Sequence, residues 1–171
     1  MIQQTPWIER SFQFHFDTGL FPVIFSRLEG SIFRLHVLLN TEDEILERKE
    51  AGWSVKEHAG HLLDMEATWW QRLQDFNEGK AELSPADMTN RKTEEARHNE
   101  RPVEEILQAF SLERQKLLEA VYDFDKTALS RSALHPRLRI PMRVIDSLFF
   151  VAEHDDHHIA AISNLLRKPV G

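Results

Sequence analysis

Four long segments of the chain repeat apolar residues at the spacing of an α-helix, and no other feature constrains the fold as strongly. They cover approximately residues 22–39, 54–79, 102–124 and 141–167. Each segment has one apolar face, and such a helix is stable in water only when that face is buried against other elements. The sequence offers no convincing pair of strands and no internal repeat. The four helices are therefore expected to bury their apolar faces against one another.

Local signals indicate where these helices begin. Ser54 is a favourable N-cap, and Glu57 stands at the third helical position, which together form a capping-box pattern. Pro102 and Pro141 stand at the expected starts of the third and fourth helices, where proline is tolerated. The order of elements predicts an all-α fold, an antiparallel four-helix bundle, in which residues 80–101 form a longer crossover between the second and third helices.

The length of the chain bounds its domain organisation. A chain of 171 residues can bury one sizeable core, so residues 1–171 are expected to form a single helical bundle domain. Residues 1–20 contain the alternation FQFHF and are predicted to form an extended aromatic arm laid across this domain.

Charge and composition exclude several classes of function. With a formal net charge of -7, the chain has no overall basic field to hold nucleic acid or an anionic membrane. No apolar run reaches the length that crosses a bilayer, and the N-terminus lacks the pattern of a signal peptide. The absence of cysteine excludes disulfides, thiolate metal ligands and a cysteine nucleophile. We therefore expect a cytoplasmic protein that binds neither nucleic acid nor membranes.

The last predicted helix contains the stretch AEHDDHHIAA, residues 152–161, which concentrates histidine and aspartate. His154 and His158 are four residues apart, so they lie on the same helix face, at one flank of the apolar stripe. His157 points roughly the other way and is expected to face solvent. Two imidazoles at this spacing can bind one cation, although a solvated polar face would show the same pattern.

A metal site in a bundle needs a ligand from a facing helix, and the helix after Ser54 offers His58 and His61. His58 lies near the centre of the apolar stripe and His61 at its flank. A catalytic metal at the edge of the core favours His61, but the helical wheel leaves both open, since His58 is either a core histidine or the ligand itself. The other histidines have no second histidine three or four residues away on a helix face and are interpreted as surface or loop residues: His15, His36, His98 and His135. His98 is the first exception to consider, because it lies in the long crossover.

Three carboxylates are candidates for a general base, and spacing alone selects none of them: Glu57, Asp64 and Asp155. Asp155 falls near the middle of the apolar stripe, where a carboxylate needs a partner. It either accepts a hydrogen bond from the second nitrogen of a ligand imidazole or lies at the exposed mouth of the bundle. Trp69 and Trp70 either line a pocket or belong to the core. The crossover is either a solvated linker or a source of substrate contacts.

Two stretches of the chain resemble the DinB-like family, four-helix-bundle proteins that include relatives of bacillithiol- and mycothiol-dependent transferases: GWSVKEHAGHLLDMEATW and EHDDHHIAAI. The family pattern is a Trp-Ser/Thr pair at the start of the second helix, a histidine eight residues after the tryptophan, and HxxxH in the last helix. Here these residues are Trp53 with Ser54, His61, and His154 with His158. The resemblance implies one divalent transition metal, zinc or nickel, held by the three histidines, and a homodimer.

Three neutral imidazoles leave the metal its double charge, so it would acidify a bound water or deprotonate a bound thiol. The resemblance therefore implies a metal-dependent enzyme acting on a small molecule, either by S-transfer or isomerisation with a low-molecular-weight thiol, or by hydrolysis. The alternative is a non-catalytic binding or structural module stabilised by metal. A closed shell, with His98 or a carboxylate as fourth ligand, would indicate the structural role, whereas an open position in a pocket would indicate catalysis.

Overall fold

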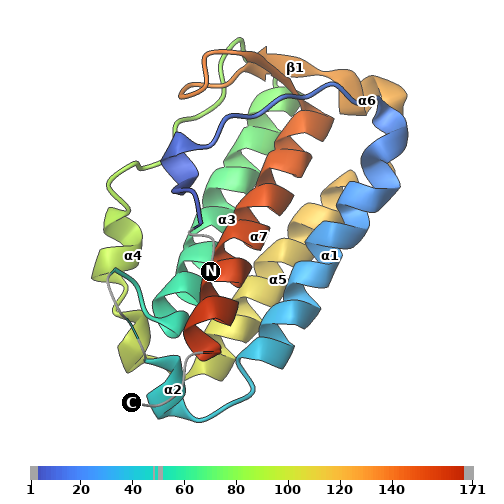
Figure 1. Cartoon of the computed structure of the whole chain (residues 1–171). Coiled ribbons are helices and arrows are strands. Elements are labelled where there is room, and N and C mark those ends of the chain that lie inside the picture. Colours follow the sequence, from blue (N-terminus) through green and yellow to red (C-terminus); the bar gives the residue numbers. More distant parts are fainter. Residues whose placement is uncertain (1–3, 48, 50–51, 168–171) are drawn as a thin grey trace.

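Four long helices form the body of the computed structural model, which describes residues 4–47, 49 and 52–167 (Figure 1). Shorter elements lie in the connections between them. The all-α four-helix bundle and its long crossover between the second and third helices are confirmed. The long helices are α1 (Phe21–Leu38), α3 (Val55–Asn77), α5 (Val103–Val121) and α7 (Val144–Leu166). The short helices are η1 (Trp7–Glu9), η2 (Thr18–Leu20), α2 (Asp43–Leu46), α4 (Arg91–Glu95), η3 (His98–Glu100) and α6 (Lys126–Ser130).

The directions of the helices depend on the crossover between α3 and α5. In Figure 1, α1 and α7 run towards the bottom of the view, whereas α3 and α5 run towards the top. Around the bundle the helices are arranged in the order α1, α7, α3, α5. The expected antiparallel packing holds for α1 with α5 and for α3 with α7, but α1 and α7 are parallel, as are α3 and α5. The reason is that residues 78–102 return along the bundle, so α5 begins at the same end as α3.

The N-terminus of α3 has the predicted capping box. The Ser54 hydroxyl accepts the N–H of Glu57 at 3.1 Å, and the Glu57 carboxylate accepts the N–H of Ser54 at 2.7 Å. Just beyond the other end, Gly79 adopts a φ of 68°, a left-handed conformation that suits glycine and ends the helix. The capping box and Gly79 therefore set where α3 begins and ends, and so where its histidines lie along the bundle axis.

The start of the last helix differs from the expectation. α7 begins at Val144 because the three preceding residues form β2 (Pro141–Arg143), which pairs antiparallel with β1 (Ser132–Leu134). The prediction that the chain lacks strand pairs was therefore wrong. Three-residue strands are too short to show an alternating pattern, and the crossover supports this hairpin, since the N–H of Leu83 donates to the carbonyl of Leu134 at 3.0 Å.

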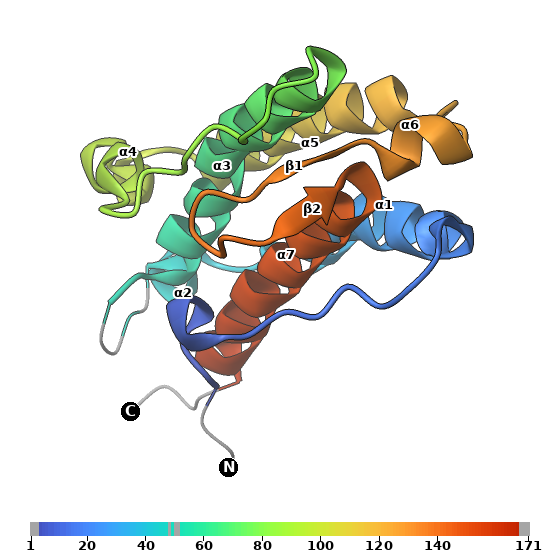
Figure 2. The ribbon, with the colours of Figure 1, turned by 90° about the horizontal axis from the view of Figure 1, so that it is seen from above.

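The N-terminal arm lies along α7, as Figure 2 shows for the dark blue segment. The ring centroids of Trp7 and Phe12 are 4.9 Å from that of Phe150, and Phe16 lies 5.1 Å from Phe149. In the FQFHF stretch, half-buried phenylalanines alternate with exposed residues, as the sequence pattern indicates. The first three residues of the expected arm lie outside the described part of the chain.

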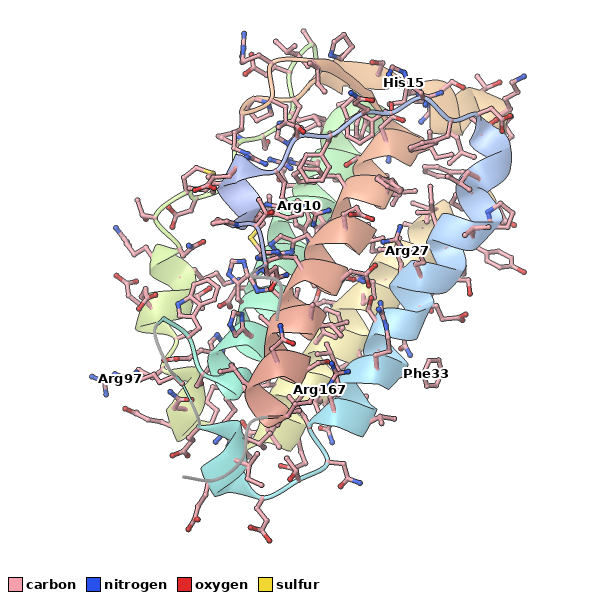
Figure 3. All side chains as sticks on the ribbon, in the orientation of Figure 1. Arg10, His15, Arg27, Phe33, Arg97 and Arg167 are labelled. Carbon is pink, nitrogen blue, oxygen red and sulfur yellow. The ribbon has the colours of Figure 1, made fainter. Side chains whose placement is uncertain are left out.

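Ion pairs join the arm and α1 to the polar edge of α7. Arg10 and Arg27 both donate to the carboxylate of Glu153, and Arg27 also pairs with Asp156. Figure 3 shows Arg27 between α1 and α7, whereas Phe33 on the same helix points away from the bundle. No helix in the described part of the chain is both long and apolar enough to cross a membrane.

Candidate metal centre

Three histidines from two adjacent helices converge at the edge of the core. His61 stands on α3, and His154 and His158 stand on α7. All three are buried, and one ring nitrogen of each lies within 4.8 Å of the others. Because α3 and α7 pack side by side, the four-residue spacing on α7 brings two imidazoles to the one on α3. The residues that the family pattern singles out therefore meet in space.

The hydrogen bonds of His61 determine which of its nitrogens is free. Its Nδ1 lies 3.0 Å from the hydroxyl of Thr93, which also hydrogen-bonds the carboxylate of Asp64. A carboxylate only accepts, so Thr93 gives its proton to Asp64 and accepts one from Nδ1 of His61. Nε2 of His61 therefore carries a lone pair, and it faces Nε2 of His154 at 3.3 Å. A cation placed there would find a lone pair on Nε2 of His61.

His58, the other histidine of α3, lies beside the cluster. Its Nδ1 is 2.9 Å from Nδ1 of His158, on the side of that ring away from Nε2. The group of ring nitrogens that lie within 4.8 Å of one another contains His61 and not His58, a distinction that the helical wheel could not make. Trp53 covers this side of the cluster, with its ring centroid 4.5 Å from that of His61.

Burial keeps the three imidazoles neutral. It lowers the pKa of His61 from 6.5 to about 4. It lowers the pKa values of His154 and His158 well below 6.5, and neighbouring imidazoles lower them further. Neutral imidazole nitrogens are suitable ligands for zinc, nickel and similar divalent ions. The residues present therefore fit a divalent transition metal with three nitrogen ligands.

A cavity of about 430 Å³ opens beside the three histidines, which form part of its wall. Trp69 lies on one side of His154 with ring centroids 5.5 Å apart, and Trp7 of the arm lies on another side at 5.1 Å. Trp70 is 42% exposed and does not line the cavity, so the two tryptophans have different roles. Residues 85–88 and 90 of the crossover line it as well, so this segment is more than a solvated linker.

The first two candidate bases, Glu57 and Asp64, lie outside the wall of the cavity. The Glu57 carboxylate is held in the capping box. The Asp64 carboxylate accepts a hydrogen bond from Nε2 of His98 at 2.8 Å. Burial would raise the pKa of Asp64, but hydrogen bonds from His98 and Thr93 lower it below its ordinary value. Asp64 therefore reaches the cluster through Thr93 and His61, with no direct contact to the cavity.

Asp155, the third candidate, is fully buried and pairs with Arg114 of α5. Both of its carboxylate oxygens accept from that guanidinium, which also donates to Glu66 of α3 at 2.6 Å. Neither expected placement holds, because Asp155 binds a guanidinium rather than an imidazole and lies in the core rather than at an exposed mouth. Burial raises the pKa of Glu66 to about 7, although Arg114 lowers it. This trio joins three helices of the bundle.

Two of the four histidines interpreted as surface or loop residues lie in connections, as expected, but are buried, and one of them is His98, the exception considered from the sequence. His98 is completely buried against α3, and His135 is 1% exposed beside Arg72. Both belong to connections that fold back onto α3, which sequence periodicity cannot reveal. His15 and His36 are exposed, as expected.

His157 is half-buried, contrary to the expectation that it faces solvent. The side-chain nitrogen of Gln4 lies 2.9 Å from Nδ1 of His157, and Trp7 lies 5.7 Å from its ring centroid. The N-terminal arm covers this face of α7, and a helical wheel of one helix cannot show such a cover.

Sequence reasoning missed Thr93 and two arginines of the cavity, Arg72 and Arg137. Arg72 could have been found from the sequence, because it stands three residues after Trp69 on the apolar face of α3. A charged side chain buried on such a face requires a hydrogen-bonding or charged partner. Thr93 and Arg137 lie in connections, and no pattern in the sequence marks them.

Residues 29–162 match the family model of the DinB superfamily, and this match covers most of the chain. The chain belongs to the DinB superfamily. The matched range contains the three histidines and all of α3 and α5. The fold of this DinB-superfamily chain is similar to that of YfiT from Bacillus subtilis, described as a probable metal-dependent hydrolase with an unusual four-helix bundle topology. The two share 18% sequence identity with a TM-score of 0.80, over 93% of each chain. No curated protein sequence matches the chain.

Proposed function

We propose that the protein is a metal-dependent hydrolase of small molecules, with one divalent transition metal held by His61, His154 and His158. The observation that carries this proposal is the convergence of three neutral imidazoles at the wall of a cavity of about 430 Å³. The YfiT structure, with its description as a probable metal-dependent hydrolase, supports the same reaction class.

The composition of the cluster favours catalysis over a structural site. Among the described residues, the group contains three histidines and no fourth histidine or carboxylate. His98, the fourth ligand considered from the sequence, is held by Asp64. A structural site is normally closed by four protein ligands, whereas a catalytic site keeps a position for water or substrate.

The protein's own residues would orient and shield the site. A divalent metal held by His61, His154 and His158 would supply Lewis-acid chemistry there, which acidifies water and polarises carbonyl groups. Thr93 holds the His61 ring by accepting its Nδ1–H. Trp53 and Trp69 cover neighbouring sides of the cluster. An apolar wall of this kind would receive the carbon skeleton of the substrate.

The test begins with metal content. Protein purified without a histidine tag is incubated with zinc or nickel, dialysed and assayed by elemental analysis, beside His154→Ala and His157→Ala. About one metal per chain is expected, with loss in His154→Ala and retention in His157→Ala. No metal in the native protein, or equal loss in both variants, would refute the site.

The reaction is tested next on the metal-loaded protein. A panel of small esters and amides is assayed with and without a chelator, and with and without a low-molecular-weight thiol such as glutathione. Metal-dependent hydrolysis without thiol is the expected result. Turnover that requires the thiol would replace hydrolysis by S-transfer, which the chain could perform only with a thiol cosubstrate because it has no cysteine.

A further inference from the structure

A second group of polar side chains lies in the wall of the same cavity, beyond the three histidines. It consists of Arg72, His135 and Arg137. The guanidinium carbon of Arg72 lies 5.4 Å from the ring centroid of Trp69, and that of Arg137 lies 5.9 Å from the ring of Phe150. Trp69 is in turn 5.5 Å from His154. The aromatic rings therefore separate this group from the three histidines, and a single small molecule could touch both.

His135 shows that the group has donors but lacks an acceptor. Its Nδ1 accepts the backbone N–H groups of Arg137 at 3.2 Å and Leu138 at 3.1 Å. Burial, reinforced by the two arginines, lowers the pKa of His135 to about 3, so the ring is neutral and its single proton is on Nε2. Nε2 lies 3.2 Å from Nη1 of Arg72, which can only donate. Two donors thus face each other, and an oxygen that accepts from both would satisfy them.

Neither guanidinium group donates a hydrogen bond to a carboxylate among the described residues. Nη2 of Arg137 is buried without a hydrogen-bond partner among the described residues, and Nη1 donates to the backbone carbonyl of Ile8. Arg72 is 2% exposed and donates to the carbonyl of Ser84. Burial lowers its pKa to about 10 despite the field of Asp75.

The neighbouring carboxylates are occupied by other donors. Asp75 accepts from Lys80 and from the N–H of Ser84. Asp87, which also lines the cavity, accepts from Thr89 and from the N–H of Arg91. Neither carboxylate therefore accepts a hydrogen bond from Arg72 or Arg137, although the charge of Asp75 still acts on Arg72.

We propose that Arg72, His135 and Arg137 bind an oxyanion of the substrate, a carboxylate or a phosphate, while its apolar body lies on Trp69 and Phe150. The substrate is thus an organic anion whose reacting group, at the other end of the molecule, reaches the three histidines. Guanidinium groups bind such oxyanions with paired hydrogen bonds. The assignment of the reacting end rests on the proposed function, whereas the binding of the anion does not.

Binding of three matched probes tests this assignment: phenylacetate, its neutral analogue phenylacetamide, and phenyl phosphate. Isothermal titration calorimetry is run in phosphate-free buffer on zinc-loaded protein and on His154→Ala, which removes a histidine of the cluster. Arg137→Gln removes a proposed donor. Arg139→Gln is the control, because this arginine stands two residues away, is 62% exposed in its side chain and pairs with Glu82. Circular dichroism checks that each variant is folded.

The expected result is that an anionic probe binds at least about tenfold more tightly than phenylacetamide, in the native protein and in His154→Ala alike. Arg137→Gln should abolish this preference and Arg139→Gln should keep it. Tighter binding of phenyl phosphate would assign the site to phosphate, and tighter binding of phenylacetate would assign it to carboxylate.

In the native protein, equal binding of the anionic probes and of phenylacetamide would by itself overturn the proposal. A preference that disappears in His154→Ala but persists in Arg137→Gln would also overturn it, since a metal would then hold the anion. If no metal binds but the preference persists, the hydrolase proposal fails and the anion site stands.

Discussion

His58 and His158 meet through their Nδ1 atoms at 2.9 Å, one from α3 and one from α7. A single proton lies between the two nitrogens. If Nε2 of His158 binds a metal, its Nδ1 must keep the proton, so His158 donates and His58 accepts. This hydrogen bond fixes both the tautomer and the ring orientation of His158. His58 is therefore a positioning residue for the proposed metal site, although it does not belong to the cluster of three.

Replacing His58 should weaken metal binding without abolishing it. We expect His58→Ala to lower zinc affinity by about 10- to 100-fold, the range found when partners of metal-bound histidines are removed. Competition with a chromophoric chelator measures the affinity. His36→Ala, which alters an exposed histidine of α1, should match the native protein. An unchanged affinity in His58→Ala would contradict the orienting role.

Asp155 should be essential for stability rather than for metal binding. Its removal leaves the buried Arg114 with one carboxylate partner, Glu66. Breaking a buried ion pair typically costs about 3–5 kcal/mol, so Asp155→Ala should lower the free energy of unfolding by about that amount. Urea denaturation measures this quantity, and elemental analysis of the folded fraction should still find the metal.

The neighbouring residue provides the control for that experiment. Asp156 pairs with Arg27 and Arg34 at a partly exposed edge. Because partly exposed pairs are screened by solvent, Asp156→Ala should cost about 1 kcal/mol or less. Equal destabilisation by the two variants would be inconsistent with a special role for the buried trio.

Gly60 allows the crossover to pack on α3. A Cβ at this position would collide with the ring of His98, so Gly60→Ala must displace the imidazole that holds Asp64. We expect a loss of roughly 1–3 kcal/mol in the free energy of unfolding, as for other overpacked sites. A methyl group at Gly30, in the middle of α1, would have open space around it, so Gly30→Ala should instead stabilise by roughly 0.5–1 kcal/mol. Thermal unfolding measures the change in stability of each variant relative to the native protein. A change of the same sign in both variants would refute the argument.

Asp75 should make stability depend on pH in the acid range. Burial would raise its pKa, but hydrogen bonds from Lys80 and Ser84 prevail and lower it from 3.8 to about 2. Its folded-state pKa is therefore below the unfolded value, so its contribution is present above pH 4 and is lost as the pH falls towards 2. The difference in urea midpoint between the native protein and Asp75→Asn should shrink over this window. A constant difference from pH 6 to pH 2 would contradict the assignment.

The sequence by itself determined the features that depend on residues close together along the chain. Ser54 and Glu57 form a capping box because both partners lie within one helical turn. His154 and His158 share a face because they are four residues apart on one helix. Four amphipathic segments without long strands required a helical bundle. The three histidines could be singled out because the spacing and the family pattern agreed on them.

Only the tertiary structure decided the relationships between residues far apart in the chain. It grouped His61, and not His58, with the two histidines of α7, although His58 and His61 lie less than one turn apart on α3. It paired Asp155 with Arg114, 41 residues away, and buried His135 in a connection that folds back onto α3. The parallel directions of α3 and α5 follow from the path of the crossover. A helical pattern records which face is apolar, but the identity of the groups that meet that face depends on how the helices pack.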